Sequence, residues 1–482
     1  MFILFILEFI FNSFYYSDAI ARVQNPMFPF VLHFTSMVIS YPILRDLWHW
    51  FNQKKFKVSI FSIYAVFSYS IYVYPLSKFR YLYFYSTRDV GTSLTAALLY
   101  VGIFSLLTWL ICYYLIRTRY KTGDYFANIF ETIEINNQVS VFLNVISALA
   151  VATYFFPNIN ILFKSLELTQ MISWFELIAS IWIAYLLVFK SGASFIFGII
   201  LFSAIIIQVL STTQIGFALK PLLAFLLMYI TKHERIPLLW GTILVGAFSI
   251  LLSLKGIVRQ QLWNRNDPTA TYTVSQKADA WKNAFLNFYT EEQKFKSAND
   301  YTDADKDYYL SQGVYISPEI DAVNRLAQIA IFTHVMDFTP SVIPNWGWYS
   351  YQQIFTKPIP RLLWPNKPIE GVGNYFGHYY SLIFDDDKYT TINLPFIVES
   401  YVSFEWMGLF IALIIGLALA QIQKLIVSGS TLLWKLYGVI AYFKMLNMES
   451  NLSLIFGDLL LLALFIEIMH RIFPVPQKRQ LV

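Results

Sequence analysis

The sequence predicts an all-α polytopic membrane protein with about twelve transmembrane helices and one large, partly helical loop outside the membrane. Composition is the first observation behind this prediction: of 482 residues, 57% are hydrophobic and 13% are charged, against roughly 25% charged in a soluble domain. Apolar stretches long enough to cross a bilayer recur along the chain, and half of the 30 acidic residues fall in one late segment. These features exclude disorder, a collagen-like fibre and a cytosolic enzyme.

Charge and cysteine content narrow the function classes further. The formal net charge of +5 is too small to indicate a nucleic-acid partner, and Lys and Arg in a membrane protein are better interpreted as topology signals. The single cysteine, Cys112, lies in an apolar run. Neither a disulfide framework nor a cysteine-based metal site is therefore expected.

Twelve stretches match the roughly 20 apolar residues that a membrane-spanning helix needs. The first begins Met1-Phe2-Ile3 without a basic flank or a clear cleavage site, so we expect a retained signal anchor. Nine stretches precede the acidic segment and three follow it. They lie near residues 1–17, 29–46, 57–76, 92–116, 139–156, 170–189, 193–210, 215–231, 236–254, 396–420, 431–447 and 452–470.

The distribution of basic residues predicts the orientation. With the N-terminus in the cytoplasm, the cytoplasmic loops and tail carry fourteen Lys and Arg residues and the short external loops carry seven. This bias favours that orientation, although the loop with Lys78, Arg80 and Arg88 opposes it. The chain then divides into a membrane domain, a large external segment and a second membrane domain, at residues 1–254, 255–395 and 396–482.

The external segment is the expected place for chemistry, because long loops in compact proteins are usually functional; a passive cap is the alternative. An amphipathic helix is predicted over 275–296, where Ala278, Trp281 and Phe285 follow a three-four spacing. It suits either the membrane surface or the segment's own core.

A second helix is predicted from Ser317-Pro318-Glu319, which can cap and open it, to about Met336. His334 falls within about 40° of Ile320 on its apolar face, and Arg325 points roughly the opposite way. Both are candidate site residues. A buried interface histidine and an ordinary ion pair with the residue four positions before Arg325 are the structural alternatives.

No metal site is expected. Asp303, Asp305 and Asp307 imitate the start of a calcium loop, but Tyr308 stands where that loop needs Gly and Val314 where it needs Glu. No cofactor is expected either, because Gly371, Gly373 and Gly377 follow no strand and make no dinucleotide fingerprint; they would allow tight turning.

Two groups of cations are candidate anion-binding residues. Lys255, Arg259 and Arg265 follow the ninth predicted span, where like charges four residues apart repel unless an anion lies between them. Interfacial anchoring is the alternative. In the second group, four prolines between residues 358 and 368 stiffen the backbone, so Arg361 and Lys367 would be presented with little conformational freedom.

Two stretches resemble motifs of the Wzy-type polymerases of O-antigen and capsule repeat units. The first is Pro360-Arg361-Leu362-Leu363-Trp364-Pro365-Asn366-Lys367-Pro368, and the second is Glu399-Ser400-Tyr401-Val402-Ser403-Phe404-Glu405-Trp406-Met407-Gly408. The family often has Asn-Phe-Gly where this chain has Ser-Phe-Glu at 403–405. The arrangement of many spans with one large late loop is also similar.

The resemblance implies a metal-independent glycosyltransferase of the GT-C type in the bacterial inner membrane, with the large loop in the periplasm. Donor and acceptor would be oligosaccharides linked to undecaprenyl diphosphate, and the partners would be membrane lipid and a chain-length regulator. Cations would stabilise the departing diphosphate, with Arg259, Arg265, Arg325 and Arg361 as first candidates and Lys255 and Lys367 as weaker ones.

The base that accepts the acceptor's proton would be Glu399 or His334. Glu399 lies at the start of the tenth predicted span, and an ionisable group at that depth is a functional candidate by default. An interfacial carboxylate paired with a nearby Lys is the structural alternative. Direct attack without a strong base is also possible, because a diphosphate is a good leaving group.

Other functions remain open at this point. An O-antigen ligase has a similar architecture and the same kind of donor, but transfers the glycan to a lipid A core. A transporter or flippase of lipid-linked sugars would show broken helices and polar groups near the midplane, often in repeated halves, and we find no convincing internal repeat. A pure scaffold is the third alternative.

Overall fold

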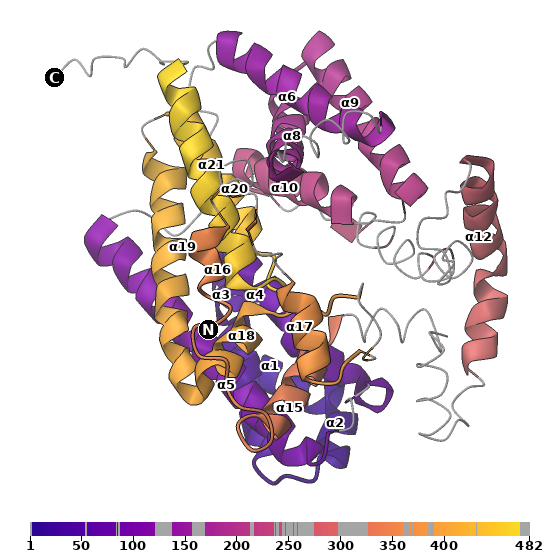
Figure 1. The fold of residues 1–482 in the computed structure, drawn as a ribbon, viewed down its shortest axis with the longest axis vertical. Coiled ribbons are helices and arrows are strands. Elements are labelled where there is room, and N and C mark those ends of the chain that lie inside the picture. The colour runs from indigo at the N-terminus through magenta and orange to yellow at the C-terminus, as the bar shows by residue number, and fades with distance from the viewer. Residues whose placement is uncertain are drawn as a thin grey trace.

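The computed structural model is helical throughout its described part, with no β-strand in it (Figure 1). It describes residues 2–53, 55–82, 84, 87–120, 137–156, 169–212, 216–235, 237, 241–242, 246, 254, 258, 274–296, 326–357, 359, 364, 366–367, 371–383, 385, 390–429 and 431–472. The predicted all-α class is therefore confirmed for these residues. The helices are α1 (Phe2–Tyr15), α2 (Ser17–Arg22), α3 (Phe28–Gln53), α4 (Ile60–Tyr72), η1 (Tyr74–Tyr81), α5 (Val90–Tyr114), η2 (Leu115–Tyr120), α6 (Asn137–Phe155), α8 (Thr169–Phe189), α9 (Ala193–Thr212), α10 (Gly216–His233), α12 (Val274–Lys296), α15 (Gln328–Phe338), α16 (Gln353–Thr356), α17 (Val372–Tyr379), α18 (Phe396–Phe404), η4 (Glu405–Leu409), α19 (Phe410–Ser428), α20 (Leu432–Met445) and α21 (Leu452–Ile472).

Among the described residues, four helical stretches are long and apolar enough to cross a bilayer, which makes the chain a helical membrane protein. They are Ile60–Phe79, Val90–Arg119, Phe396–Ser428 and Leu452–Ile472. The other predicted spans also contain helices, except that 236–254 lies almost wholly outside the described residues. With 14 residues, α20 is about 21 Å long, shorter than the roughly 30 Å apolar core of a bilayer.

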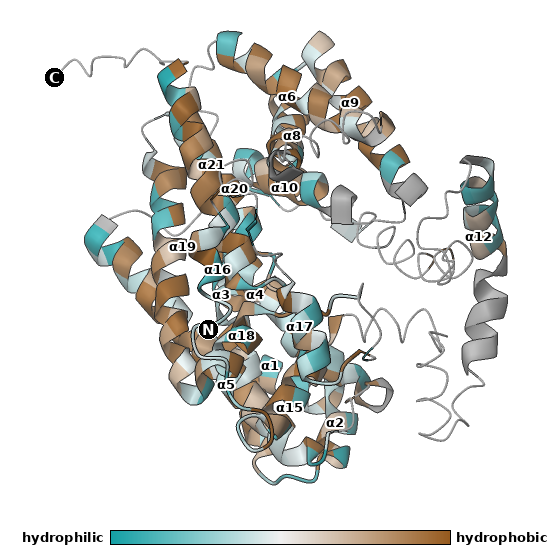
Figure 2. Cartoon of the chain, in the orientation of Figure 1, coloured by the Kyte–Doolittle hydropathy of each residue, from teal (hydrophilic) through white to brown (hydrophobic). Residues whose placement is uncertain are grey.

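Two groups of helices are visible in Figure 1. Helices α6, α8, α9 and α10 pack together, and α1 to α5 form the other group with α15 to α19. Helix α20 joins the two, because it packs on α19 and α21 and also contacts α8. Brown, apolar residues dominate α19 and α21 in Figure 2.

Polar side chains inside the group that contains α1 to α5 hydrogen-bond from helix to helix. The Asn12 amide donates to Ser36 Oγ over 2.8 Å, and the Thr35 hydroxyl donates to the Leu98 carbonyl over 2.8 Å. Such bonds add to packing where lipid removes the hydrophobic drive between helices.

Helix α5 begins at a capping residue outside the bilayer. Asp89 Oδ1 accepts the Thr92 backbone N–H over 3.0 Å, and this bond lowers the pKa of the Asp89 carboxyl. Because the cap satisfies one of the first four N–H groups of the helix, the start of α5 is well defined.

The tenth predicted span is interrupted. A single helix was expected over 396–420, but helix α18 ends at Phe404, Glu405 has φ +52°, and α19 begins at Phe410. In one helix, Ser400 and Gly408 would lie about 12 Å apart, whereas here they are in contact.

The two parts of this hairpin pack on the same side of α5 in opposite directions. Phe396 lies beside Phe104 and Tyr401 beside Tyr100, so α18 is antiparallel to α5. The Thr108 hydroxyl then reaches the Ala412 carbonyl over 3.3 Å, so α19 is parallel to α5.

The described half of the external segment shares one hydrophobic core with the membrane helices. Ile329, Phe332 and Val335 of α15 are buried in it, as is Phe376 of α17. Phe332 packs at 5.5 Å on the Tyr100 ring of α5. This half of the segment is therefore built into the bundle.

Helix α12 (Val274–Lys296) confirms the helix predicted over 275–296, and Trp281 of the predicted stripe packs on its buried residues. Ala280 and Ala284 are buried against Leu254 and Val258, while Phe285 is 67% exposed. The small side chains of Ala280 and Ala284 allow Leu254 and Val258 to approach α12 more closely than large side chains would.

We expect Gly408→Ala to destabilise the α18–α19 hairpin. A Cβ at this position would overlap the Ser400 carbonyl oxygen and meet Tyr100 Oη at 2.7 Å, and overpacking of this kind costs about 1–3 kcal/mol. Thermal unfolding in detergent measures it. Gly371→Ala, where the added Cβ meets nothing within 4 Å, is the matched control, and equal melting temperatures would contradict the hairpin.

Candidate functional site

Glu399 lies at the centre of the candidate site. Its side chain is completely buried, and Oε2 accepts the backbone N–H of Leu452 over 2.7 Å. Leu452 is the first residue of α21, so the carboxylate meets the positive end of a helix. Pairing of Glu399 with a nearby Lys was the structural alternative, and the described residues show no such pair. Glu399 instead joins α18 to α21.

Several polar side-chain atoms are buried around Glu399 in the described part of the chain. They are Glu399 Oε1, Ser350 Oγ, Tyr351 Oη and Ser403 Oγ. Ser350 and Tyr351 lie within electrostatic reach of the carboxylate. Ser350 lies close enough to hydrogen-bond to the Glu399 carboxylate, and Ser403 lies close enough to hydrogen-bond to Tyr351. These hydroxyls and the carboxylate therefore form a polar centre among apolar helices.

A cluster of lysines lies farther along the same helix. Asp458 of α21 pairs with Lys357 Nζ at 3.4 Å and with Lys444 Nζ at 2.8 Å. Lys357 is 5% exposed and its stem packs directly on Gly457, where any Cβ would overlap it. Lys367 is buried beside it and donates to the Lys357 carbonyl over 3.1 Å.

A second ion pair extends the cluster towards the other group of helices. Lys220 of α10 lies 3.6 Å from Glu176 of α8, and Lys444 acts electrostatically on Lys220. The lysine cluster therefore comprises Lys220, Lys357, Lys367 and Lys444, with Glu176 and Asp458 between them.

His334 occupies a different place. It is 5% exposed, which confirms that it lies on the buried face of its helix, and Nε2 lies 3.0 Å from the Tyr380 carbonyl. Because a carbonyl oxygen only accepts, this contact places a proton on Nε2, and Nδ1 is the nitrogen that could accept one. Burial raises the pKa of Tyr380, whose phenol contacts Thr339 Oγ1 at 2.5 Å.

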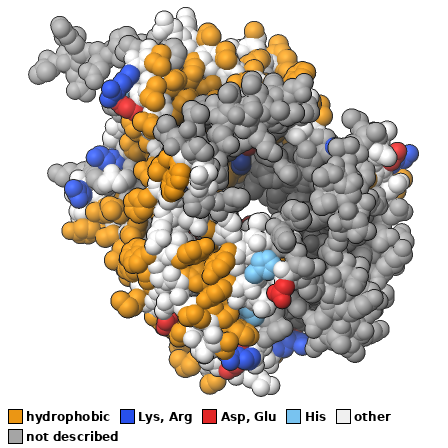
Figure 3. All heavy atoms as spheres, viewed as in Figure 1, with side chains coloured by type: hydrophobic (Ala, Val, Ile, Leu, Met, Phe, Trp, Pro, Cys, Tyr) orange, Lys and Arg blue, Asp and Glu red, His pale blue; other side chains and the backbone are white. Residues whose placement is uncertain are grey.

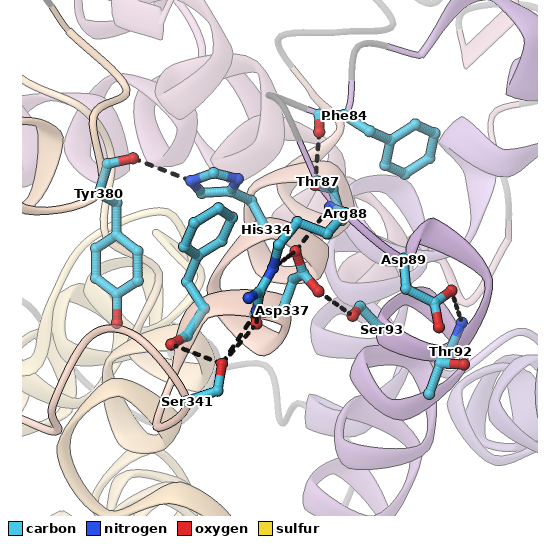
Figure 4. Close-up of polar contacts among 11 residues, drawn as sticks. Phe84, Thr87, Arg88, Asp89, Thr92, Ser93, His334, Asp337, Ser341 and Tyr380 are labelled. Atoms are coloured by element: carbon cyan, nitrogen blue, oxygen red, sulfur yellow. Dashed lines mark hydrogen bonds and ion pairs between the residues drawn. The ribbon is translucent and has the colours of Figure 1, made fainter.

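Figure 4 shows how the helix of His334 is fixed to the start of α5. The Arg88 backbone N–H and Nε donate to Asp337 Oδ2 over 2.7 and 3.1 Å, and the Arg88 guanidinium also donates to the Asp337 carbonyl and to Ser341 Oγ. Ser93 donates to Asp337 Oδ1 over 3.4 Å. The loop before α5 and the external segment therefore lie on the same side of the protein.

Three of the eight predicted site residues lie in the described part of the chain, and one segment connects two of them. Segment 350–357 passes both Glu399 and the lysine cluster with Lys367, whereas His334 lies at Tyr380. Lys255, Arg259, Arg265, Arg325 and Arg361 fall outside the described residues. No group of three potential metal ligands occurs in the part of the chain that the structure describes.

Sequence reasoning missed Ser350, Tyr351, Lys357, Lys444 and Asp458. One signal was available: Asp458 is an acidic residue inside an apolar span, where ionisable groups are expensive and usually have a role. Figure 3 shows histidine and acidic side chains at the surface near the middle of one face.

We expect Asp337→Ala to loosen α15. The Asp337 side chain is 8% exposed and takes several bonds from residues 88–93; losing hydrogen bonds to a buried charge costs about 1–3 kcal/mol. Denaturant unfolding in detergent measures this. Asp18→Ala removes an exposed ion pair with Arg22, which is worth about 0–1 kcal/mol, so similar effects of both variants would refute a structural role for Asp337.

Comparison with known proteins places one family over this site. The model of a family described as a domain of unknown function (DUF8712) matches residues 319–432. The match includes Glu399, His334, Lys357 and Lys367 and runs from the external segment through the α18–α19 hairpin. Comparison with curated proteins and with solved structures gives no match.

Proposed function

We propose that the chain polymerises oligosaccharide repeat units linked to undecaprenyl diphosphate into a surface polysaccharide, in the bacterial inner membrane. The resemblance of 360–368 and 399–408 to Wzy-type polymerases suggests this function. The observation that carries it is the completely buried Glu399 among hydroxyls at the start of α21, with a lysine cluster farther along the same helix. Burying an ionisable side chain among apolar helices costs free energy, so such residues usually have a function.

The reaction transfers the growing glycan to the newest repeat unit. An acceptor hydroxyl attacks the anomeric carbon of the donor, the bond from that carbon to the diphosphate oxygen breaks, and a new glycosidic bond forms. In this proposal Glu399 Oε1 takes the hydroxyl proton, and the departing lipid diphosphate keeps the electron pair of the broken bond.

Cations would stabilise the charge that develops on the diphosphate. Fixed charge of this kind is usually the largest catalytic contribution. Lys367 and its neighbours Lys357 and Lys444 can supply it within the described residues, and Arg361 follows Lys357 by four positions in the proline-stiffened stretch. Lys357 and Lys444 already share Asp458, so their ammonium groups are held in place before substrate arrives.

A transporter of lipid-linked sugars is the second candidate, and one observation favours it. Helix 396–428 is broken at 405–409, with a buried carboxylate on the shorter part. Transporters build binding sites from discontinuous helices of this kind. Chain growth without any gradient separates the two functions.

We expect Glu399→Gln to reduce chain growth at least about 100-fold, the usual lower limit for losing a general base. The amide oxygen can still accept the Leu452 N–H, so the fold should persist. The assay uses purified protein in nanodiscs with the strain's lipid-linked repeat unit, and reads chain length on a gel.

Glu467→Gln is the matched control, because Glu467 is a half-exposed carboxylate on α21 that pairs with Arg471. It should polymerise as the wild type does. Full activity of a folded Glu399→Gln variant would remove Glu399 as the base, and no chain growth by the wild type with this substrate would refute the polymerase itself.

We expect Arg361→Ala to leave the protein folded and to abolish polymerisation, so that cells display single repeat units. The reason is loss of a cation that stabilises the diphosphate. Arg471→Ala, at an arginine whose side chain is 78% exposed, serves as the control in the same cells. Long chains from Arg361→Ala would exclude Arg361 from the site, and unattached lipid-linked long chains on deletion of the gene would indicate a ligase.

A further inference from the structure

Four aromatic side chains form a cluster at the surface of the external segment. Trp346 lies 5.3 Å from Tyr375 and 5.8 Å from Tyr379, Tyr349 lies 5.2 Å from Tyr375, and Tyr375 stacks on Tyr379 at 5.3 Å. Tyr349 is 46% exposed and Tyr375 is 40% exposed. We call these four residues the aromatic platform.

The chain is built to present this platform. Gly373 and Gly377 lie on one face of α17, where a Cβ would meet the Ile392 carbonyl oxygen at 2.7 Å and Ile383 Cδ1 at 2.8 Å. The predicted role of these glycines in tight turning is therefore wrong, because they lie inside a helix and allow residues 383–392 to pack closely. Tyr375 and Tyr379 fall roughly 200° away on the same helix, where Tyr375 is exposed and Tyr379 is partly buried.

The surroundings of the platform are polar. Asn374 and His378 lie on α17 beside the tyrosines, and Asn374 Nδ2 donates to the Thr390 carbonyl over 2.7 Å. Figure 2 shows α17 in teal and white, unlike the brown helices α19 and α21. Trp346 Nε1 is buried without an acceptor among the described residues, which leaves a donor inside the cluster.

A different set of aromatics faces the apolar side of the hairpin. Trp348 packs at 4.9 Å on Phe404 and 6.4 Å on Phe410, next to Met407, which is 80% exposed. This second set suits a lipid interface, where Trp anchors helices. The platform differs from it by its tyrosine hydroxyls and polar neighbours.

We propose that the aromatic platform binds pyranose rings of the oligosaccharide, and so forms a glycan subsite next to the reaction centre. The inference rests on the proposed function. Tyr and Trp rings offer flat apolar faces for the C–H faces of a sugar, and their polar edges offer hydrogen bonds to its hydroxyls. Trp346 donates its backbone N–H to the Val402 carbonyl over 3.0 Å, so the platform is tied to the α18 helix that carries Glu399.

The test measures binding of a soluble glycan without its lipid. The probe is the oligosaccharide released by mild acid from the strain's own lipid-linked repeat unit, titrated against the full chain in nanodiscs. We expect Tyr375→Ala to raise Kd about tenfold, equal to about 1.4 kcal/mol, and Tyr375→Phe, which keeps the ring, to change it much less.

Tyr114→Ala is the matched control, because Tyr114 is a 60% exposed tyrosine outside the platform, at the last residue of α5. This variant should leave Kd unchanged. Tyr349→Ala provides a second loss of an exposed platform ring if Tyr375→Ala fails to fold. Undecaprenyl phosphate, which has the lipid and no sugar, should bind equally to the wild type and both alanine variants.

The outcomes separate the subsite from the polymerase. Glycan binding that depends on Tyr375 but occurs without chain growth would keep the subsite and reject the proposed function. Normal chain growth with unchanged Kd in both alanine variants would reject the subsite alone, as would failure of the wild type to bind the probe. Lower recovery of folded variants from membranes with unchanged Kd would identify the platform as a membrane anchor and overturn the proposal.

Discussion

The contact between Glu399 Oε2 and the Leu452 backbone N–H holds the functional part of this protein together. A hydrogen bond to a charged group contributes about 1.5–3 kcal/mol, and here the carboxylate also meets the positive end of α21. The bond fixes α18 against the start of α21. Since Asp458 lies six residues farther along α21, the same contact sets where the lysine cluster stands relative to Glu399.

The break in helix 396–428 follows from the same arrangement. In one continuous helix, residues 396–428 would run along α5 in a single direction. The turn at 405–409 reverses the chain, so that α18 runs antiparallel to α5. Irregular backbone at membrane depth must be buried in protein or line a polar cavity, and the contact of Gly408 with Ser400 and Tyr100 supplies that burial. The polar centre therefore needs the hairpin, and the hairpin needs a residue without a side chain at 408.

Much of the helical framework could be predicted from the sequence, because long apolar runs have few alternatives to a helix in a bilayer. The burial of His334 followed from helical spacing alone. The hairpin could not be predicted, since the apolar run continues through Trp406 and Met407 and only a tertiary contact at Gly408 shows the turn. The pairing of Lys357 with Asp458 joins residues about a hundred positions apart, and no local spacing encodes it.

The lysine cluster and the aromatic platform connect through one short segment of chain. Residues 346–349 supply two rings of the platform, Ser350 and Tyr351 reach towards Glu399, and Lys357 ends the segment at Asp458. Under the proposed function, the groups assigned to sugar, proton and phosphate follow one another within twelve residues of sequence. A lipid-linked oligosaccharide presents the same order, with its sugars on one side of the reacting bond and its diphosphate on the other. The family match over residues 319–432 includes both this segment and the α18–α19 hairpin.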